Sequence, residues 1–262
     1  MTSIPAFDLS GRAFLVVGGA GYLGTPTGEL IARLGGDVVI ADISAEKTEV
    51  AVAAIEAVGG TGKVSGLSID IADEASILAV VRQAAARGNL GGVVMSTSGA
   101  SGKRLDDLTA EDFDRANRIN LTGTFLLARE AARHMGQGGS IVLYSSMYGV
   151  VAPVMANYPP PMPPNPIEYG AGKAGIVQMV KYLAAHYGRS GIRVNAIVPG
   201  PFPHPATVAA NPEFIGNLER ATMLGRIGAQ HETAGPTAFL LSPASSYVTG
   251  HVLTVDGGWT AW

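Results

Sequence analysis

A tyrosine and a lysine stand four residues apart at Tyr169 and Lys173, a spacing that suits proton transfer. In a helix, residues four apart share a face, so both side chains can act on one proton. A free tyrosine has a pKa of about 10 and is a poor base at neutral pH unless a nearby cation stabilises its phenolate. Lys173 supplies such a cation, so the pair predicts acid–base chemistry on an alcohol or ketone. The alternative is a solvated helix face.

A glycine-rich turn near the N-terminus strengthens the chemical interpretation. Glycines at 18, 19, 21 and 24 follow a strand-length apolar run at 13–17 and precede an amphipathic helix. In that context, glycines let the backbone approach a pyrophosphate held at the helix N-terminus. The segment 18–24 therefore predicts a dinucleotide site, with an ordinary tight turn as the alternative.

Two acidic residues end the next two apolar runs. Asp42 ends the second run, where a carboxylate can accept hydrogen bonds from both ribose hydroxyls and repel a 2′-phosphate. This position predicts NAD in preference to NADP, with capping of the helix expected from Ser44 as the alternative role. Asp70 ends the third run, where it either bonds an adenine amino group or is a loop acid beside a helix cap. The sequence alone leaves both interpretations of Asp70 open.

Strand-length apolar runs alternate with helix-length amphipathic stretches along the whole chain. Strands are expected at 13–17, 37–41, 64–69, 92–96, 140–144, 192–198 and 252–255. Helices are expected up to about 34, at about 45–58, 73–87 and 111–135, and around Tyr169 to about 187. Strands rich in Val, Ile and Leu between helices imply a parallel sheet covered on both faces. We therefore predict one Rossmann-type doubly wound α/β domain over residues 1–262, with ligands at the carboxyl ends of the strands.

Two proline-rich segments interrupt this alternation. Seven of the 16 prolines fall within 153–166, and further prolines follow the sixth expected strand between 199 and 212. Proline fixes φ and removes a donor, so neither segment is expected to form a helix or a central strand. We predict an active-site insertion at about 150–168 that forms a wall of the substrate site, and a lid region at about 200–225. The alternative for the insertion is a longer surface excursion.

The composition excludes several classes of protein. A net charge of −3, with 18 Lys and Arg scattered along the chain, provides no basic field for nucleic acid or an anionic membrane. The chain has no cysteine, so it forms neither a disulfide nor a thiolate metal site, and no metal centre is predicted. The N-terminus lacks the pattern of a signal peptide, and no apolar run approaches about 18 residues, so we expect a cytoplasmic protein.

Taken together, the motifs resemble the compact single-domain type of the short-chain dehydrogenase/reductase family over nearly the whole chain. The matching parts are the turn at 18–24, Asp42, Asn120, Ser146, Tyr169 with Lys173, Pro199 with Gly200, and 256–258. The resemblance implies a catalytic tetrad of Asn120, Ser146, Tyr169 and Lys173. In the family, the serine hydrogen-bonds the substrate oxygen and the lysine also holds the nicotinamide ribose. The asparagine binds a water that relays protons to solvent.

The resemblance also assigns contacts to the two ligands and to a partner subunit. It implies cofactor contacts from Gly18, Gly21, Tyr22, Leu23, Gly24, Asp42, Asp70, Ile71, Ser98, Gly99, Tyr169, Lys173, Pro199, Gly200 and Phe202. It implies substrate contacts from Ser146, Met147, Tyr158, Tyr169 and His204. It further implies a homotetramer in which the helices containing Asn120 and Tyr169 pack between subunits. Trp259 and Trp262 are large aromatics that contact either a partner or the surface of their own subunit.

Three features depart from the family pattern. Tyr22 stands where a middle glycine is usual, which makes the glycine spacing similar to the extended branch of epimerases and dehydratases. Only about 60 residues follow Gly200, too few for the C-terminal substrate domain of that branch. Residues 96–98 are Ser-Thr-Ser in place of a segment with two amides. His204 replaces a threonine that bonds the nicotinamide carboxamide.

The predicted function is an NAD-dependent oxidoreductase that interconverts a secondary alcohol and a ketone by hydride transfer. Resemblance around 145–149 and 256–259 favours a sugar, a polyol or a sugar acid as the substrate. A cyclic alcohol is an alternative because few basic residues are expected near the crevice, and a 3-oxoacyl-type ketone is another. An epimerase or dehydratase that retains NAD, and a cofactor-binding scaffold or redox sensor, are alternatives of other classes.

Overall fold

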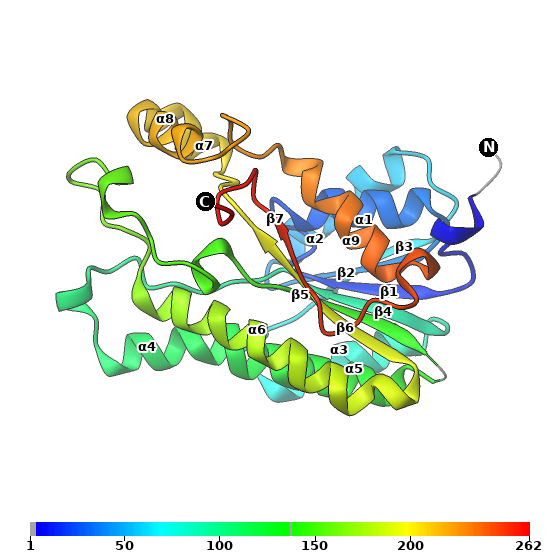
Figure 1. The fold of residues 1–262 in the computed structure, drawn as a ribbon. Helices are drawn as coiled ribbons and strands as arrows, with labels where there is room; N and C mark the ends of the chain where they lie inside the picture. The colour runs from blue at the N-terminus through cyan, green and yellow to red at the C-terminus, as the bar shows by residue number, and fades with distance from the viewer. Residues whose placement is uncertain (1–3, 137) are drawn as a thin grey trace.

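The computed structural model describes residues 4–136 and 138–262. Within them, a parallel sheet of seven strands lies between two layers of helices (Figure 1). In the order in which they lie side by side, the strands are β3 (Val64–Ser68), β2 (Asp37–Asp42), β1 (Ala13–Val17), β4 (Leu90–Met95), β5 (Gly139–Tyr144), β6 (Ile192–Pro199) and β7 (Val252–Val255). This architecture confirms the predicted doubly wound α/β fold.

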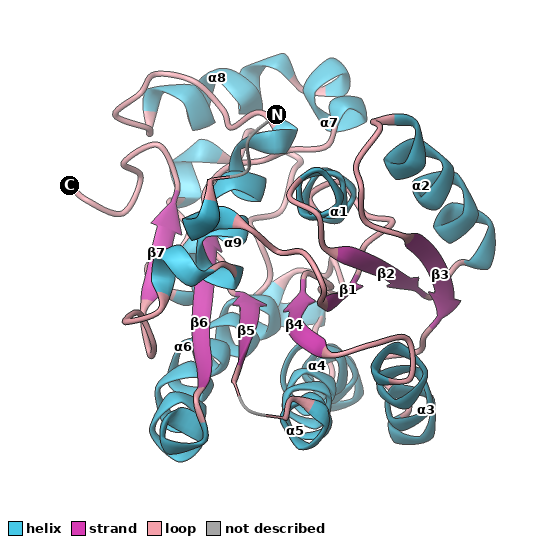
Figure 2. Cartoon of the chain, turned by 90° about the vertical axis from the view of Figure 1, so that its right-hand side faces the viewer, coloured by secondary structure: helices cyan, strands magenta, loops and turns pink. Residues whose placement is uncertain are grey.

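Helices cover both faces of the sheet, as Figure 2 shows. One layer contains α1 (Gly24–Arg33), α2 (Ala45–Ala57) and α9 (Ala234–Leu241). The other contains α3 (Glu74–Ala85), α4 (Ala110–Asn117), α5 (Thr124–His134) and α6 (Ile167–Tyr187). Five short single turns in the described chain lie between these elements or at its ends, namely η1 (Pro5–Phe7), η2 (Leu105–Asp107), η6 (Gly188–Ser190), η7 (Gln230–Thr233) and η8 (Pro243–Ser245). No helix in the part of the chain that the structure describes could span a bilayer.

The central strand β1 explains why both layers are needed. All five of its residues are buried. Leu15 and Val17 pack into the apolar core beneath α3, α5 and α6, whereas Phe14 and Val16 pack into the core beneath α1, α2 and α9. Because successive strand residues point to opposite faces, a strand buried throughout requires a cover on each side.

The helix expected at 111–135 is not continuous. A π-helical turn, η3 (Arg118–Gly123), separates α4 from α5. Within this turn, the Asn120 carbonyl accepts a hydrogen bond from the Thr124 hydroxyl at 2.7 Å. Helix α6 packs closely against it, since a Cβ added to Gly172 would lie 2.9 Å from the Asn120 Cβ. Isolated π turns often occur at functional sites.

The proline-rich insertion is irregular, and it extends beyond the carboxyl edge of the sheet below α7 and α8 (Figure 1). Its only regular turns in the described chain are η4 (Met147–Gly149) and η5 (Met155–Asn157), before α6 begins at Ile167. The second proline-rich segment differs from the expectation of a loop up to 212, because it contains α7 (Pro205–Ala210) and α8 (Pro212–Arg220). Pro205 and Pro212 occupy the first helical position, where the missing N–H removes no hydrogen bond.

Candidate active site

A cavity of about 470 Å³ opens at the carboxyl edge of the sheet, where the strand order reverses between β1 and β4. Such reversals form the ligand crevice of doubly wound sheets. The lining includes eleven of the predicted ligand contacts, namely Gly18, Gly21, Tyr22, Leu23, Gly24, Asp42, Asp70, Ile71, Ser98, Phe202 and His204. Gly99, Tyr169, Lys173, Pro199 and Gly200 are outside this lining.

The glycine turn has the shape that a dinucleotide requires. A Cβ added to Gly24 would lie 2.2 Å from the Gly18 carbonyl oxygen, so the turn closes only without a side chain. Gly18 itself has a φ of 77°, which glycine adopts without strain. Helix α1 begins at Gly24 with no side-chain cap, so its first turn leaves backbone N–H groups for an anion. These residues fit the pyrophosphate of a dinucleotide.

The two strand-end acids have distinct local roles. Asp42 lines the cavity and accepts a hydrogen bond from the Ile43 N–H at 2.8 Å. It does not cap α2, because the Ser44 hydroxyl does so by accepting from the Lys47 N–H at 3.2 Å. Asp70 also lines the cavity, and it accepts from the Ala72 N–H at 2.8 Å. Asp70 is therefore a loop acid within reach of the same ligand.

Lys173 is buried on the inner face of α6. Its ammonium donates to the backbone carbonyls of Tyr144, at 2.8 Å, and Thr97, at 3.3 Å. The Nζ atom lies 5.6 Å from the centroid of the Tyr169 ring. Burial lowers the pKa of Lys173 to about 7 from an ordinary value of 10.5. The lysine thus joins the ends of β4 and β5 to the first turns of α6.

Tyr169 stands beside Ser146, which follows β5. Desolvation by the surrounding protein raises the pKa of Tyr169, and a hydrogen bond with the Ser146 side chain partly offsets this rise. Stabilisation of the Tyr169 phenolate by Lys173 stays a prediction.

Asn120 is buried in the π turn and holds the segment that follows β4. Its side-chain oxygen accepts from the Gly99 N–H at 2.9 Å, and its Nδ2 donates to the Gly99 carbonyl at 2.7 Å. Both polar atoms of the amide are thus engaged with one backbone position. Asn120 therefore positions the backbone of Gly99 and its neighbours near the mouth of the cavity.

The sequence analysis did not single out Glu168, a fully buried carboxylate next to Tyr169. Its Oε1 accepts from the backbone N–H and the hydroxyl of Ser101, at 2.8 and 2.7 Å. Glu168 thereby ties the loop after β4 to α6. The sequence signal that could have identified Glu168 was its place directly before Tyr169.

A separate apolar cluster joins the turn after β5 to the lid helix α8. It consists of Met147, Ile215, Leu218 and Trp259, with Tyr148 and Phe214 packed against it. Trp259 therefore packs within its own subunit, whereas Trp262 is exposed. His204 lies elsewhere, because it caps α7 and its ring is 5.5 Å from the Tyr22 ring in the cofactor cavity. His204 thus lines the cofactor cavity, and its contact with the substrate stays a prediction.

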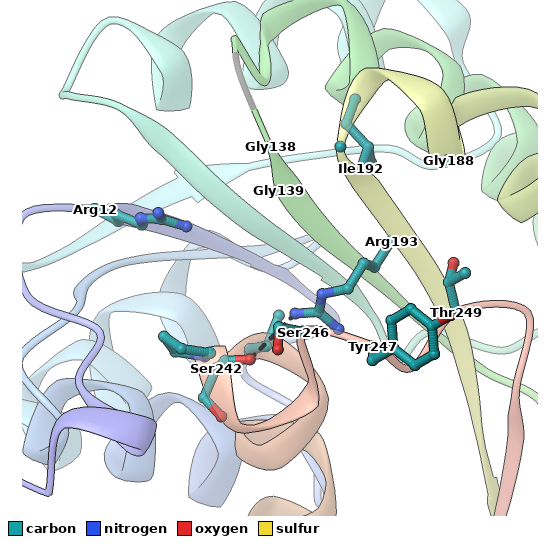
Figure 3. A pocket seen from close by; sticks show the side chains of 13 residues that line it. Arg12, Gly138, Gly139, Gly188, Ile192, Arg193, Ser242, Ser246, Tyr247 and Thr249 are labelled. Carbon is teal, nitrogen blue, oxygen red and sulfur yellow. Dashed lines mark hydrogen bonds between the residues drawn. The ribbon is translucent and has the colours of Figure 1, made fainter.

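A larger cavity, of about 590 Å³, lies at the opposite, amino edge of the sheet (Figure 3). Arg12 and Arg193 line it, and the Arg193 guanidinium donates to the backbone carbonyls of Ser242 and Val248. Its described lining contains neither a candidate base nor a nucleophile with a partner. Residues 4–136 and 138–262 also contain no group of three metal-ligating side chains.

A doubly wound sheet with a glycine turn, a strand-end acid and a Tyr-Lys helix face defines the class of Rossmann-type dinucleotide-binding proteins. Comparison with known proteins identifies the family within this class. The family model described as enoyl-(acyl carrier protein) reductase matches residues 20–260. The chain belongs to the short-chain dehydrogenase/reductase family and is an oxidoreductase that acts on alcohols and ketones.

Three relatives illustrate the range of this similarity. The chain is 37% identical to 2,5-dichloro-2,5-cyclohexadiene-1,4-diol dehydrogenase of Sphingobium indicum, over 97% of this chain and 99% of the relative. It is 34% identical to cis-4-hydroxycyclohexanecarboxylate dehydrogenase of Sinomonas cyclohexanicum, over 95% and 97% of the two chains. The solved structure of a putative gluconate dehydrogenase from Agrobacterium tumefaciens superposes with a TM-score of 0.87, at 29% identity, over 97% and 98% of the chains. These names do not single out the predicted sugar and polyol subtype.

Proposed function

We propose that this protein is an NAD-dependent dehydrogenase that interconverts a secondary alcohol on a carbocyclic ring and the corresponding ketone. The observation that carries the proposal is the pairing of Tyr169 with Ser146, which directly precedes Met147 of the apolar cluster. A nicotinamide cofactor, when bound, supplies the acceptor or donor of hydride. The chain supplies the proton transfer and the orientation of the substrate.

Four residues carry these tasks. Tyr169 takes the proton of the reacting hydroxyl during oxidation and returns it during reduction. The Ser146 hydroxyl bonds the same substrate oxygen and, through its bond to Tyr169, aligns the two groups. Lys173 places positive charge beside the tyrosine ring. Asn120 holds the backbone at Gly99, which directly follows the cavity-lining Ser98.

The lid side of the site favours a ring over a sugar. Met147, Ile215, Leu218 and Trp259 form a buried apolar cluster that begins at the residue after Ser146, so the protein next to a substrate held at Ser146 is apolar. A carbocyclic ring gains free energy from such contacts, whereas each sugar hydroxyl placed there would lose hydrogen bonds to water. Two relatives are named for substrates with a six-membered carbocycle, which agrees with this choice.

A panel of alcohols tests the proposed function. With NAD, cyclohexanol and cyclohexanediols are expected to give NADH with kcat/KM at least about tenfold above sorbitol and gluconate, because the apolar wall favours a carbocycle. The measurement is the initial rate of absorbance increase from NADH. Gluconate or sorbitol as the best substrate would restore the sugar prediction. Tightly retained NAD without turnover of any alcohol would favour the epimerase or scaffold alternatives.

The preference for NAD is assigned to Asp42. Asp42→Ala is expected to lower the ratio of kcat/KM with NAD to that with NADP by about 10- to 100-fold, because a charged acceptor of ribose hydroxyls is lost together with its repulsion of a 2′-phosphate. The measurement is the rate with each cofactor at fixed alcohol. Asp37→Ala, at the other end of β2, is the matched control and should leave the ratio unchanged. A wild-type protein that prefers NADP contradicts the assignment.

A homo-oligomer that packs through α4, α5 and α6 remains part of the proposal. Phe113, Phe125 and Ile167 of these helices are exposed. A cavity of about 520 Å³ between the insertion and α6 includes Ile167 in its lining, which is dominated by apolar residues. Apolar surface of this kind supports an interface between copies of the chain.

A further inference from the structure

Two tyrosines, Tyr148 and Tyr158, form a hydrogen-bonded pair beside the candidate catalytic residues. Their hydroxyl oxygens are 2.5 Å apart. Tyr148 lies in the turn directly after Ser146, and its backbone N–H donates to the Ser146 hydroxyl at 3.2 Å. Tyr158 comes from the proline-rich insertion, and its ring centroid is 5.3 Å from that of Phe214 in α8. The pair therefore connects the catalytic serine to the lid.

Both phenols remain neutral at physiological pH. Desolvation raises the pKa of Tyr148 and of Tyr158. The pKa of Tyr148 rises further because a phenolate at either Tyr158 or Tyr169 would repel its own negative charge. Tyr148 also lies against the first turn of α6, since a Cβ added to Gly170 would be 3.1 Å from the Tyr148 carbonyl oxygen. The pair can act on a substrate only by hydrogen bonding, since neither phenol titrates in the physiological range.

The hydrogen bond between the two tyrosines leaves one of their two phenol protons unused. Two phenols carry two protons, and the bond between them uses one. The Tyr158 oxygen also accepts from the backbone N–H of Asn165. Among the residues that the structure describes, no other acceptor lies within hydrogen-bonding distance of either hydroxyl. The second proton is therefore available to water or to a ligand.

The insertion around the pair contains further unmatched polar atoms. Within the described chain, the Asn157 Nδ2 and the Asn165 Oδ1 are buried without a hydrogen-bond partner. The neighbouring Asn157 carbonyl accepts from Asn217 Nδ2 of α8 at 3.1 Å, so the lid fixes this part of the insertion. Native proteins seldom leave buried polar atoms unpaired, and a polar ligand or water is the usual partner. Unmatched polar atoms therefore accompany the tyrosine pair in the insertion.

We propose that the Tyr148–Tyr158 pair selects substrates with a second oxygen, namely ring diols and the hydroxyketones formed from them. The pair donates its free proton to the substrate oxygen that does not react. This inference rests on the proposed function, which places the reacting hydroxyl at Tyr169 and Ser146. A ring with a single hydroxyl displaces the water at the pair without replacing its hydrogen bond, and so loses affinity.

The test compares kcat/KM for cyclohexanol and for the 1,2-, 1,3- and 1,4-cyclohexanediols. The wild-type protein is expected to prefer at least one diol by about tenfold, the value of one well-placed hydrogen bond, and the double variant Tyr148→Phe/Tyr158→Phe to lose that preference. Removing both hydroxyls leaves neither phenol without its partner, whereas a single change strands the other phenol; the Asn165 N–H loses an acceptor in the double variant. Tyr182→Phe, an exposed position of α6, is the matched control.

Calorimetric binding of the same four alcohols to the NADH-loaded protein separates this inference from the proposed function. Loss of the diol preference in the double variant supports the pair, whether it is seen in turnover or in binding alone. Absence of turnover with retained discrimination in binding overturns the dehydrogenase proposal and leaves the pair supported. An equal diol preference in the wild-type protein and the double variant, in either measurement, overturns the role of the pair.

Discussion

Replacing Tyr169 with phenylalanine is expected to lower kcat for a ring alcohol by about 10²- to 10⁴-fold, the contribution of a positioned general acid or base. The substitution keeps the aromatic ring and removes the hydroxyl that bonds Ser146. Affinity for NADH should change little, because Tyr169 is outside the lining of the cofactor cavity. Steady-state kinetics together with NADH fluorescence titration measure both quantities.

A tyrosine elsewhere on the same helix provides the control for this variant. Tyr182 lies on the exposed face of α6, so Tyr182→Phe should retain the wild-type kcat. A Tyr169→Phe protein that is folded, binds NADH and turns over at more than about a tenth of the wild-type rate would show that another group moves the proton. The fall in kcat should be larger than any rise in KM, since the proton is transferred only in the reaction step.

Replacing Lys173 with methionine is expected to change activity and stability in opposite directions. The kcat should fall by about 10²- to 10³-fold, because the positive charge that stabilises a developing phenolate is removed. At pH 6, the free energy of unfolding of the cofactor-free protein should rise by about 1–4 kcal/mol, since an unpaired buried cation is replaced by an apolar side chain. The carbonyls of Tyr144 and Thr97 lose their donor, which limits this gain.

The pH dependence distinguishes this stability effect from simple repacking. The folded lysine has a pKa of about 7, and its ordinary value is 10.5, so between these values the unfolded chain binds more protons than the folded chain. The free energy of unfolding of the wild-type protein should therefore rise with pH over this window, and the advantage of Lys173→Met should shrink toward pH 10.

Urea denaturation of the cofactor-free proteins at pH 6 and pH 9.5 measures the difference. Lys181→Met changes an exposed lysine of the same helix and should show no such window. An advantage of Lys173→Met that stays constant between the two pH values would mean that the buried lysine does not lose its proton near neutral pH.

Several features of the site were predictable because they depend on residues that are neighbours in the chain. The apolar runs at 13–17 and 37–41 indicated strands, and the glycines between them indicated the turn that lines the cavity. The spacing of Tyr169 and Lys173 placed both on one face of α6. In each case the signal is periodic or local, and helix and strand geometry converts it directly into position.

Other features involve residues brought together from distant segments. The interruption of the helix at Asn120 depends on its amide reaching Gly99 across the fold. The Tyr148–Tyr158 bond depends on how a loop of many prolines returns toward the sheet. The burial of Glu168 depends on the loop at Ser101. No spacing within the sequence encodes such contacts, so the sequence analysis could not identify them.

The sequence by itself determined the doubly wound sheet, the glycine turn with its strand-end acid, and the helix face of Tyr169 and Lys173. Only the tertiary structure decided the electrostatics and the walls of the site. Burial, which lowers the lysine pKa and raises the tyrosine pKa, is a property of everything packed around a group. The direction of Trp259 and the place of His204 beside the cofactor cavity follow likewise from packing between elements that are far apart in the chain.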